Sequence, residues 1–162
     1  NEKLYTQQKF STEDCFKSLL ILYKWIDAMT YQNMSEHFDA EPGDIFYIKE
    51  NAKDLTYTFT EIVKFWRDHA KENDQKKIVS EYQNLIDELD LLRLQIVHGV
   101  PEKYLELVKI KQIGRVRAQI LYKNGYKNKT SLKKAPLEKL AAIDKIGAIL
   151  AKSIKSQVEK VR

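Results

Sequence analysis

The sequence is poor in residues that cross-link or interrupt a chain: among 162 residues there are one cysteine, three prolines and five glycines. The single cysteine, Cys15, excludes an internal disulfide and favours a reducing, intracellular setting. Because Phe16, Leu19 and Leu20 lie beside it on the expected helix, we predict a buried thiol rather than a nucleophile. The scarcity of Pro and Gly, with abundant Lys, Glu, Leu and Ile, predicts an all-α protein.

Motifs for nucleotide hydrolysis and metal binding are missing as well. There is no G-x-x-x-x-G-K-S/T loop and no acidic magnesium box, so we expect no catalytic residue and no cofactor in this chain itself. His37, His69 and His98 have no Cys or His partner at zinc spacing, which predicts no metal site. No apolar run approaches the roughly 18 residues of a membrane-spanning helix, so no membrane partner is expected.

Charge divides the chain into two unlike parts. Residues 1–100 hold 12 Lys and Arg against 18 Asp and Glu, a net charge of −6. Residues 101–162 hold 16 against 5, a net charge of +11. A basic field confined to one part is typical of a site for a phosphate polymer.

Apolar residues at helical spacing predict helices from Thr12 to about Met29, from Pro42 past Trp66, and from Ile78 to His98, with a short one near residues 35–38. Pro101 and Pro136 are expected to start further helices, residues 127–134 to form a basic connection, and residues 148–161 to form the last helix. Gly99 suits a helix C-cap. The predicted organisation is a helical bundle over residues 1–98 and a hairpin domain over residues 99–162. The predicted core stripes are Phe16, Leu19, Leu20, Tyr23 and Ile26; Ile45, Ile48, Ala52, Leu55, Phe59, Ile62 and Trp66; and Ile78, Tyr82, Leu85, Leu89, Leu92 and Ile96.

One pattern occurs twice in the basic part. I-x-x-I-G-x-x-x-A begins at Ile110 and returns 33 residues later at Ile143. Each copy predicts two helices joined by a tight loop, with the alanine permitting close approach and the isoleucines wedged between the helices. The pattern therefore predicts a tandem helix-hairpin-helix unit.

Such loops are suited to anions. The first turn of a helix leaves N–H groups without acceptors, and the helix dipole favours negative charge there. We expect free amides at Ile113, Gly114 and Arg115, and a nucleic-acid phosphate as the ligand. The usual L-x-G-I-G has Gln112 and Lys145 in place of its first glycine, which predicts weaker phosphate binding. The predicted DNA contacts are Lys111, Ile113, Gly114, Arg115, Arg117, Lys145, Ile146 and Gly147.

The run from His98 to Ala118, with I-G-R-V-R-A at its end and Tyr122, Asn124 and Gly125 after it, resembles a signature of archaeal Ski2-like, superfamily-two DNA helicases of the HelQ type. Upstream, L-x-x-W-I at Leu22 and P-G-D-I at Pro42 resemble further elements of that family. The resemblance, with Asn rather than Met at residue 1, implies the C-terminal part of such a helicase: the end of its ratchet bundle followed by its helix-hairpin-helix domain.

The resemblance further implies 3′ to 5′ movement on single-stranded DNA, repair of stalled forks, and motor domains elsewhere in the parent protein that use ATP and Mg. It implies single-stranded or forked DNA and those motor domains as partners, and a cytoplasmic, nucleoid-associated location. The family's base-stacking arginine and tryptophan fall on Tyr47 and Asp54, of which Tyr47 can still stack. The last arginine of the signature is Gln119 here.

Other interpretations remain open. The acidic first part and the degenerate loops are compatible with a helical protein-interaction or structural module that binds no nucleic acid. A third class is an RNA-processing relative of the same helicase superfamily, which a comparison of DNA and RNA affinity would separate. A helix-hairpin-helix glycosylase is disfavoured because Asp144 lies within the second hairpin itself.

Overall fold

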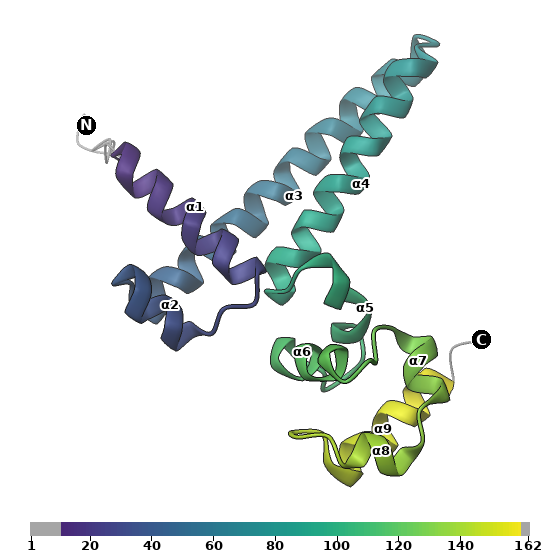
Figure 1. Ribbon diagram of the computed structural model, residues 1–162. Helices are drawn as coiled ribbons and strands as arrows, with labels where there is room; N and C mark the ends of the chain where they lie inside the picture. Colours follow the sequence, from purple (N-terminus) through teal and green to yellow (C-terminus); the bar gives the residue numbers. More distant parts are fainter. Residues whose placement is uncertain (1–10, 160–162) are drawn as a thin grey trace, which may run out of the picture.

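The computed structural model describes residues 11–159, and every regular element in that range is helical, which confirms the expected fold class (Figure 1). The helices are α1 (Thr12–Ile26), α2 (Tyr31–Phe38), α3 (Pro42–Glu72), α4 (Lys76–His98), a 3-10 turn (Glu102–Tyr104), α5 (Leu105–Val108), α6 (Arg115–Lys123), α7 (Lys129–Lys134), α8 (Leu137–Ala141) and α9 (Gly147–Glu159).

Local signals fix several helix ends. Ser11 accepts from the Asp14 amide and Asp14 caps in return, so a capping box begins α1. Pro42 occupies the first turn of α3, where its missing N–H costs nothing. Gly99 ends α4 in the left-handed conformation, with φ 60°. These three boundaries agree with the sequence prediction.

The longest feature is the antiparallel pair α3–α4, whose far end stands away from the remaining helices (Figure 1). Its interface is built from small residues: Thr56, Thr60, Val63 and Ala70 are the buried residues of α3 beyond its first turn. Both threonine hydroxyls donate to carbonyls four residues earlier, at 2.6 Å for Thr56 and 2.9 Å for Thr60, which satisfies them in the interface.

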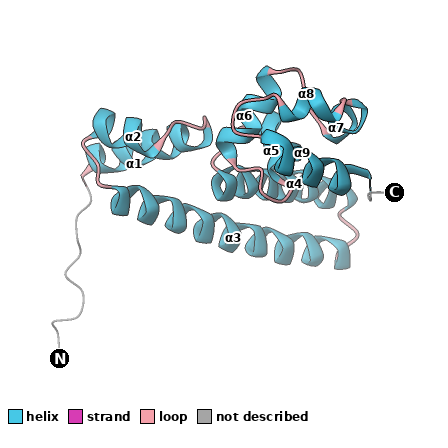
Figure 2. Cartoon of the chain, turned by 90° about the horizontal axis from the view of Figure 1, so that it is seen from below, coloured by secondary structure: helices cyan, strands magenta, loops and turns pink. Residues whose placement is uncertain are grey.

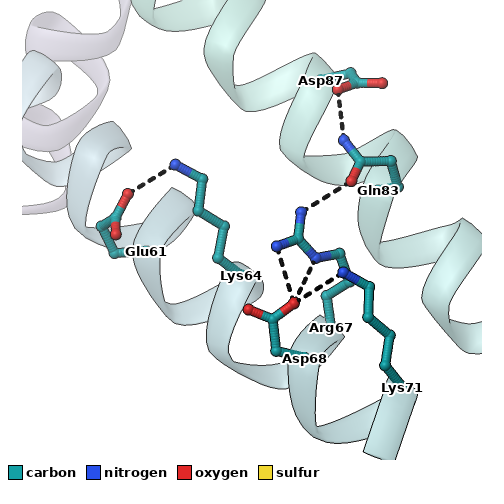
Figure 3. Close-up of polar contacts among 7 residues, drawn as sticks. All are labelled: Glu61, Lys64, Arg67, Asp68, Lys71, Gln83 and Asp87. Atoms are coloured by element: carbon teal, nitrogen blue, oxygen red, sulfur yellow. Dashed lines mark hydrogen bonds and ion pairs between the residues drawn. The ribbon is translucent and has the colours of Figure 1, made fainter.

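Polar contacts add to this pair near its far end (Figure 3). Arg67 of α3 donates to the Gln83 side chain of α4 at 2.9 Å, and Gln83 donates to Asp87 at 2.9 Å. Arg67 and Lys71 both pair with Asp68, at 2.9 and 3.1 Å. Arg67 and Gln83 are half-buried, whereas Asp68, Lys71 and Asp87 are exposed, so the ion pairs to Asp68 add little to stability.

The predicted core stripes of α1, α3 and α4 are largely wrong. On α1 the buried residues are Ile21 and Trp25, and Cys15 is exposed rather than buried. On α3 only Ile45 of the predicted stripe is buried. On α4 only Ile96 of the predicted stripe is buried, and Ile78, Leu85 and Leu92 are exposed. The apolar residues that lie open instead include Phe16, Leu19, Leu20, Tyr23, Leu55, Phe59, Ile62 and Trp66.

Two clusters form the core. The smaller one joins α1, α2 and the start of α3 around Ile21, Met34 and Ile45. The larger one fills the hairpin unit of α5 to α9, and it includes one residue from the α1–α2 turn, Ala28. Figure 2 shows α1 and α2 grouped at one end of α3, apart from α5 to α9.

The connection predicted at residues 127–134 is a short helix instead. The Asn128 side chain accepts a hydrogen bond from the Ser131 amide and caps the start of α7. The sequence prediction, based on the lysines of this segment, missed this cap. After Pro101 the chain forms a 3-10 turn before α5 rather than one continuous helix. The predicted end of the last helix, residues 160–161, lies outside the described residues.

Candidate nucleic-acid interface

The two copies of the repeated motif form the same turn. We call residues 111–114 the first tip and residues 144–147 the second tip. In the first, the Ile113 N–H donates to the Ile110 carbonyl at 3.0 Å, and in the second Ile146 donates to Ile143 at 3.1 Å. The Ile113 amide is therefore not free, contrary to the sequence prediction.

The residue before each of these isoleucines adopts a left-handed conformation. Gln112 has φ 70° and Lys145 has φ 60°. Both occupy the position where the usual motif has glycine, so the missing glycines do not prevent the turn but leave it strained by about 1–2 kcal/mol per residue.

The apolar parts of the motif pack as predicted. Ala118 and Ala151 are fully buried, and Ile113 and Ile146 are nearly so. The two tips remain at the surface because only the isoleucine of each loop points into the core.

The glycines of the tips are exposed and differ in conformation. Gly114 is the extended N-cap of α6, with φ −83°, whereas Gly147 begins α9 with φ 64°. Within residues 11–159 no group accepts a hydrogen bond from the Gly114 N–H. With the first-turn amides of α6 and α9, each tip offers unpaired donors to solvent.

Arg117 joins the tips. Its Nε donates to the Lys145 carbonyl at 3.0 Å and its Nη1 to the Gln112 carbonyl at 2.9 Å. It thus holds the two left-handed residues side by side and keeps a guanidinium charge between them. An open hollow of about 510 Å³ lies here, lined by Gly114, Arg115, Val116, Arg117 and Lys145.

The lysines of the tips are free to meet an anion. Lys111 and Lys145 are exposed, and Gln157 of α9 fixes the Lys111 backbone by accepting from its N–H at 2.8 Å. All ion pairs within the described residues 11–159 lie between residues 49 and 93. In that range no Lys or Arg after residue 100 pairs with a carboxylate. The positive charge of the hairpin unit is therefore not neutralised internally.

Two predicted residues do not direct their side chains at the tips. Arg115 begins α6, but its guanidinium lies over the Trp25 ring and donates to the Met29 carbonyl. Tyr47 is 68% exposed on α3, on the other side of the helix from the buried Ile45 cluster. No hydrogen bond among residues 11–159 connects Tyr47 with either tip.

Sequence reasoning overlooked Val116 and Ile149. They occupy equivalent repeat positions, 33 residues apart, in the first turn of α6 and α9. Their exposed fractions are 41% and 89%. These exposed aliphatic side chains offer apolar contact beside the first-turn amides of α6 and α9. Aligning the two copies of the repeat would have identified them, because both copies have a branched aliphatic residue at this position.

Within residues 11–159 no three His, Cys, Asp or Glu side chains gather at metal-binding distance. In the same range no helix combines the length and apolarity that crossing a bilayer requires.

Comparison with known proteins matches both parts of the chain. Residues 1–81 match the family described as archaeal helicase, domain 4, and residues 104–160 match the SAM-like helix-hairpin-helix tandem. The ATP-dependent DNA helicase Hel308 of Pyrococcus abyssi is 31% identical over 157 residues, covering 94% of this chain and 20% of that protein. Hel308 of Pyrococcus horikoshii is 34% identical over 140 residues, covering 86% and 18%.

This chain spans about a fifth of the length of those relatives. The helicase domain alone matches half of the chain, and the relatives match across nearly all of it. The chain belongs to the archaeal helicase family represented by Hel308.

Proposed function

We propose that the chain is a single-stranded DNA-binding module, without sequence preference, of an ATP-dependent 3′–5′ DNA helicase that acts at stalled forks. Family membership, the tandem hairpin and the basic charge of residues 101–162 support this. The observation that carries the proposal is the pair of exposed tips joined by Arg117.

In this proposal, one phosphate lies at the Gly114 amide and the first turn of α6, between Lys111 and Lys145. A second lies at the Gly147 amide, where α9 begins, because the Ile146 N–H already donates to the Ile143 carbonyl. Arg117 sets the spacing of the two positions and adds charge. Main-chain amides and cations contact the sugar–phosphate chain and read no base edges, so binding without sequence preference follows.

The remaining surfaces suit the rest of a helicase. The exposed apolar side chains of α1 and α3 are costly to leave in water, which is typical of an interaction surface. We propose that this surface packs against the motor domains of the same parent protein, which would hold ATP and Mg. Tyr47 on α3 is available for stacking on a base. DNA binding would place the protein with the nucleoid in the cytoplasm.

Salt dependence tests the proposal. Each phosphate contact on a single strand contributes roughly −0.7 to the slope of log affinity against log salt, so a few contacts predict about −2 to −3. Lys145→Ala should reduce the magnitude of the slope by about 0.7. The matched control is Lys123→Ala, which removes one charge at the C-terminal end of α6, about 12 Å along the helix from the first tip, and should leave the slope unchanged. A wild-type slope near zero would refute DNA binding by the tips.

One observation favours a second function. The apolar side chains on α1 and α3 would equally suit a separate protein partner, making this a helical interaction module. The same titration separates the two: an interaction module would retain its partner when Lys145 is replaced and would show no salt-dependent DNA affinity. Parallel titration with RNA of the same sequence tests the RNA-processing alternative.

A further inference from the structure

We propose that Arg115 is a positioning residue and not a phosphate contact: it holds α6, the helix behind the first tip, against the α1–α2 turn through Trp25. The effect on DNA binding rests on the proposed function, because the contact would place the first tip correctly for the DNA strand. The contact itself involves no DNA and can be tested without it.

The Arg115 side chain lies against the N-terminal part of the molecule. Its guanidinium carbon is 4.2 Å from the centroid of the Trp25 ring and 5.5 Å from that of Tyr31. Its Nη2 donates to the Met29 carbonyl. A planar guanidinium suits this combination of stacking and hydrogen bonding, and an ammonium does not.

Trp25 is itself held from several sides. Its Nε1 donates to the Ile96 carbonyl of α4 at 2.6 Å, and its ring lies 5.2 Å from that of Tyr31. The Lys49 ammonium of α3 is 5.5 Å from the centroid of the same ring. The indole thus connects α1, α2, α3 and α4 to the helix that follows the first tip.

Gly99 leaves the space for this stack. A Cβ there would lie 2.6 Å from two ring carbons of Trp25 and 3.0 Å from Arg115 Nη1. The C-cap glycine therefore serves the contact as well as the end of α4.

A second side chain from α6 forms a hydrogen bond with the α1–α2 turn. Gln119 lies one helical turn after Arg115 and donates to the Ala28 carbonyl at 3.3 Å. Ala28 has φ 64° and belongs to the core of the hairpin unit. Two residues of α6 spaced by four therefore bind the carbonyls of two consecutive residues, which fixes both the position and the rotation of the helix.

The charged group of Arg115 is half-buried and does not face the first tip. Burial lowers the pKa of this guanidinium below its usual value, although an arginine remains charged in proteins. Its Nη1 is buried without an acceptor among the described residues. A group that had to meet phosphate at the tip would leave all of these contacts.

Salt titration of the full chain with a labelled oligothymidylate distinguishes positioning from contact. We expect Arg115→Ala to weaken binding about threefold to tenfold, the range for loss of one cation–aromatic contact, without changing the salt slope. Lys145→Ala, by contrast, should reduce the slope by about 0.7. Trp25→Leu should reproduce the effect of Arg115→Ala, and the double variant should bind no more weakly than either.

Arg115→Lys gives the sharpest contrast, because it keeps the charge and the fold but loses the planar fork. Positioning predicts that it behaves like Arg115→Ala. The inference is overturned if Arg115→Ala lowers the slope by about 0.7, Arg115→Lys restores it, and Trp25→Leu binds like the wild type.

Hydrogen–deuterium exchange without DNA keeps this inference separate from the proposed function. Arg115→Lys and Trp25→Leu should speed exchange of amides in the α1–α2 turn and at the start of α6, and Lys145→Ala should not. Unchanged exchange in both variants would overturn the positioning role. If the wild type binds no DNA but exchange responds as described, the proposed function fails and the positioning role stands.

Discussion

Replacing Gly99 by alanine is the change whose cost the structure defines best. Gly99 has φ 60°, a conformation that costs an L-residue about 1–2 kcal/mol. The added Cβ would also lie 2.6 Å from two ring carbons of Trp25, closer than real contacts allow. Because Trp25 is held by its hydrogen bond to Ile96, the ring cannot move without losing that bond. Overpacking of this kind typically costs about 1–3 kcal/mol.

Together these effects predict that Gly99→Ala lowers the free energy of unfolding by about 2–5 kcal/mol. Urea unfolding followed by circular dichroism measures the change. Gly125→Ala is the matched control, since Gly125 also has a positive φ, 88°, but open space around it. It should show only the backbone cost, about 1–2 kcal/mol.

Gly43→Ala completes the series because Gly43 has neither a positive φ nor a near neighbour, and it lies in the first turn of α3. It should be neutral or slightly stabilising, as alanine favours the helix. Equal losses for the Gly99 and Gly125 variants would refute the claim that Gly99 makes room for the stack of Trp25 and Arg115.

Three further changes test other parts of the account. Gln112→Gly should raise the free energy of unfolding by up to about 1 kcal/mol, because relief of the left-handed strain exceeds the entropy cost of glycine; thermal unfolding that shows a loss would contradict this. Burial, with a smaller effect of the Lys109 charge, lowers the pKa of His98. The stability that His98 contributes is therefore present above its ordinary pKa of about 6.5 and is lost as the pH falls through the lowered pKa. His98→Gln should flatten the curve of unfolding free energy against pH below about 6.5, and an unchanged curve would exclude His98 as the cause. Phe59→Ser should lower the free energy of unfolding in urea by less than about 1 kcal/mol, because the ring is half exposed. A decrease of several kcal/mol would show that Phe59 belongs to the core, as the predicted stripe has it.

The sequence predicted those features of the fold that depend on nearby residues. The start of α1 at Thr12, the proline start of α3 and the glycine end of α4 each depend on residues within one turn of one another. The tandem hairpin was equally accessible, because the spacing of Ile113 and Ala118 and its repetition encode one packing geometry twice.

The core stripe of α3 could not be predicted in the same way. Burial of apolar residues is a one-way rule: cores are apolar, but many apolar side chains stay at the surface. Beyond its first turns α3 packs mainly on one neighbour, α4, and small residues such as Thr56 and Thr60 permit that approach. Leu55 and Phe59 consequently lie outside the pair although periodicity favours them.

The arrangement of the site depends on contacts distant in sequence. Arg115 donates to a carbonyl 86 residues away, and Arg117 reaches the other hairpin 28 residues away. Both arginines stand in the same motif and have the same chemistry, so the pattern assigns them one role. Only the packing of α6 against the α1–α2 turn separates them.

The most direct test of the two-tip account observes the amides themselves. The chain has only five glycines, so their backbone signals can be resolved in a nitrogen–proton correlation spectrum recorded while single-stranded oligothymidylate is added. The account predicts that the Gly114 and Gly147 amide signals shift as phosphate accepts from them, and that those of Gly43 and Gly125 stay in place. Fixed signals at Gly114 and Gly147 with DNA bound elsewhere would contradict it.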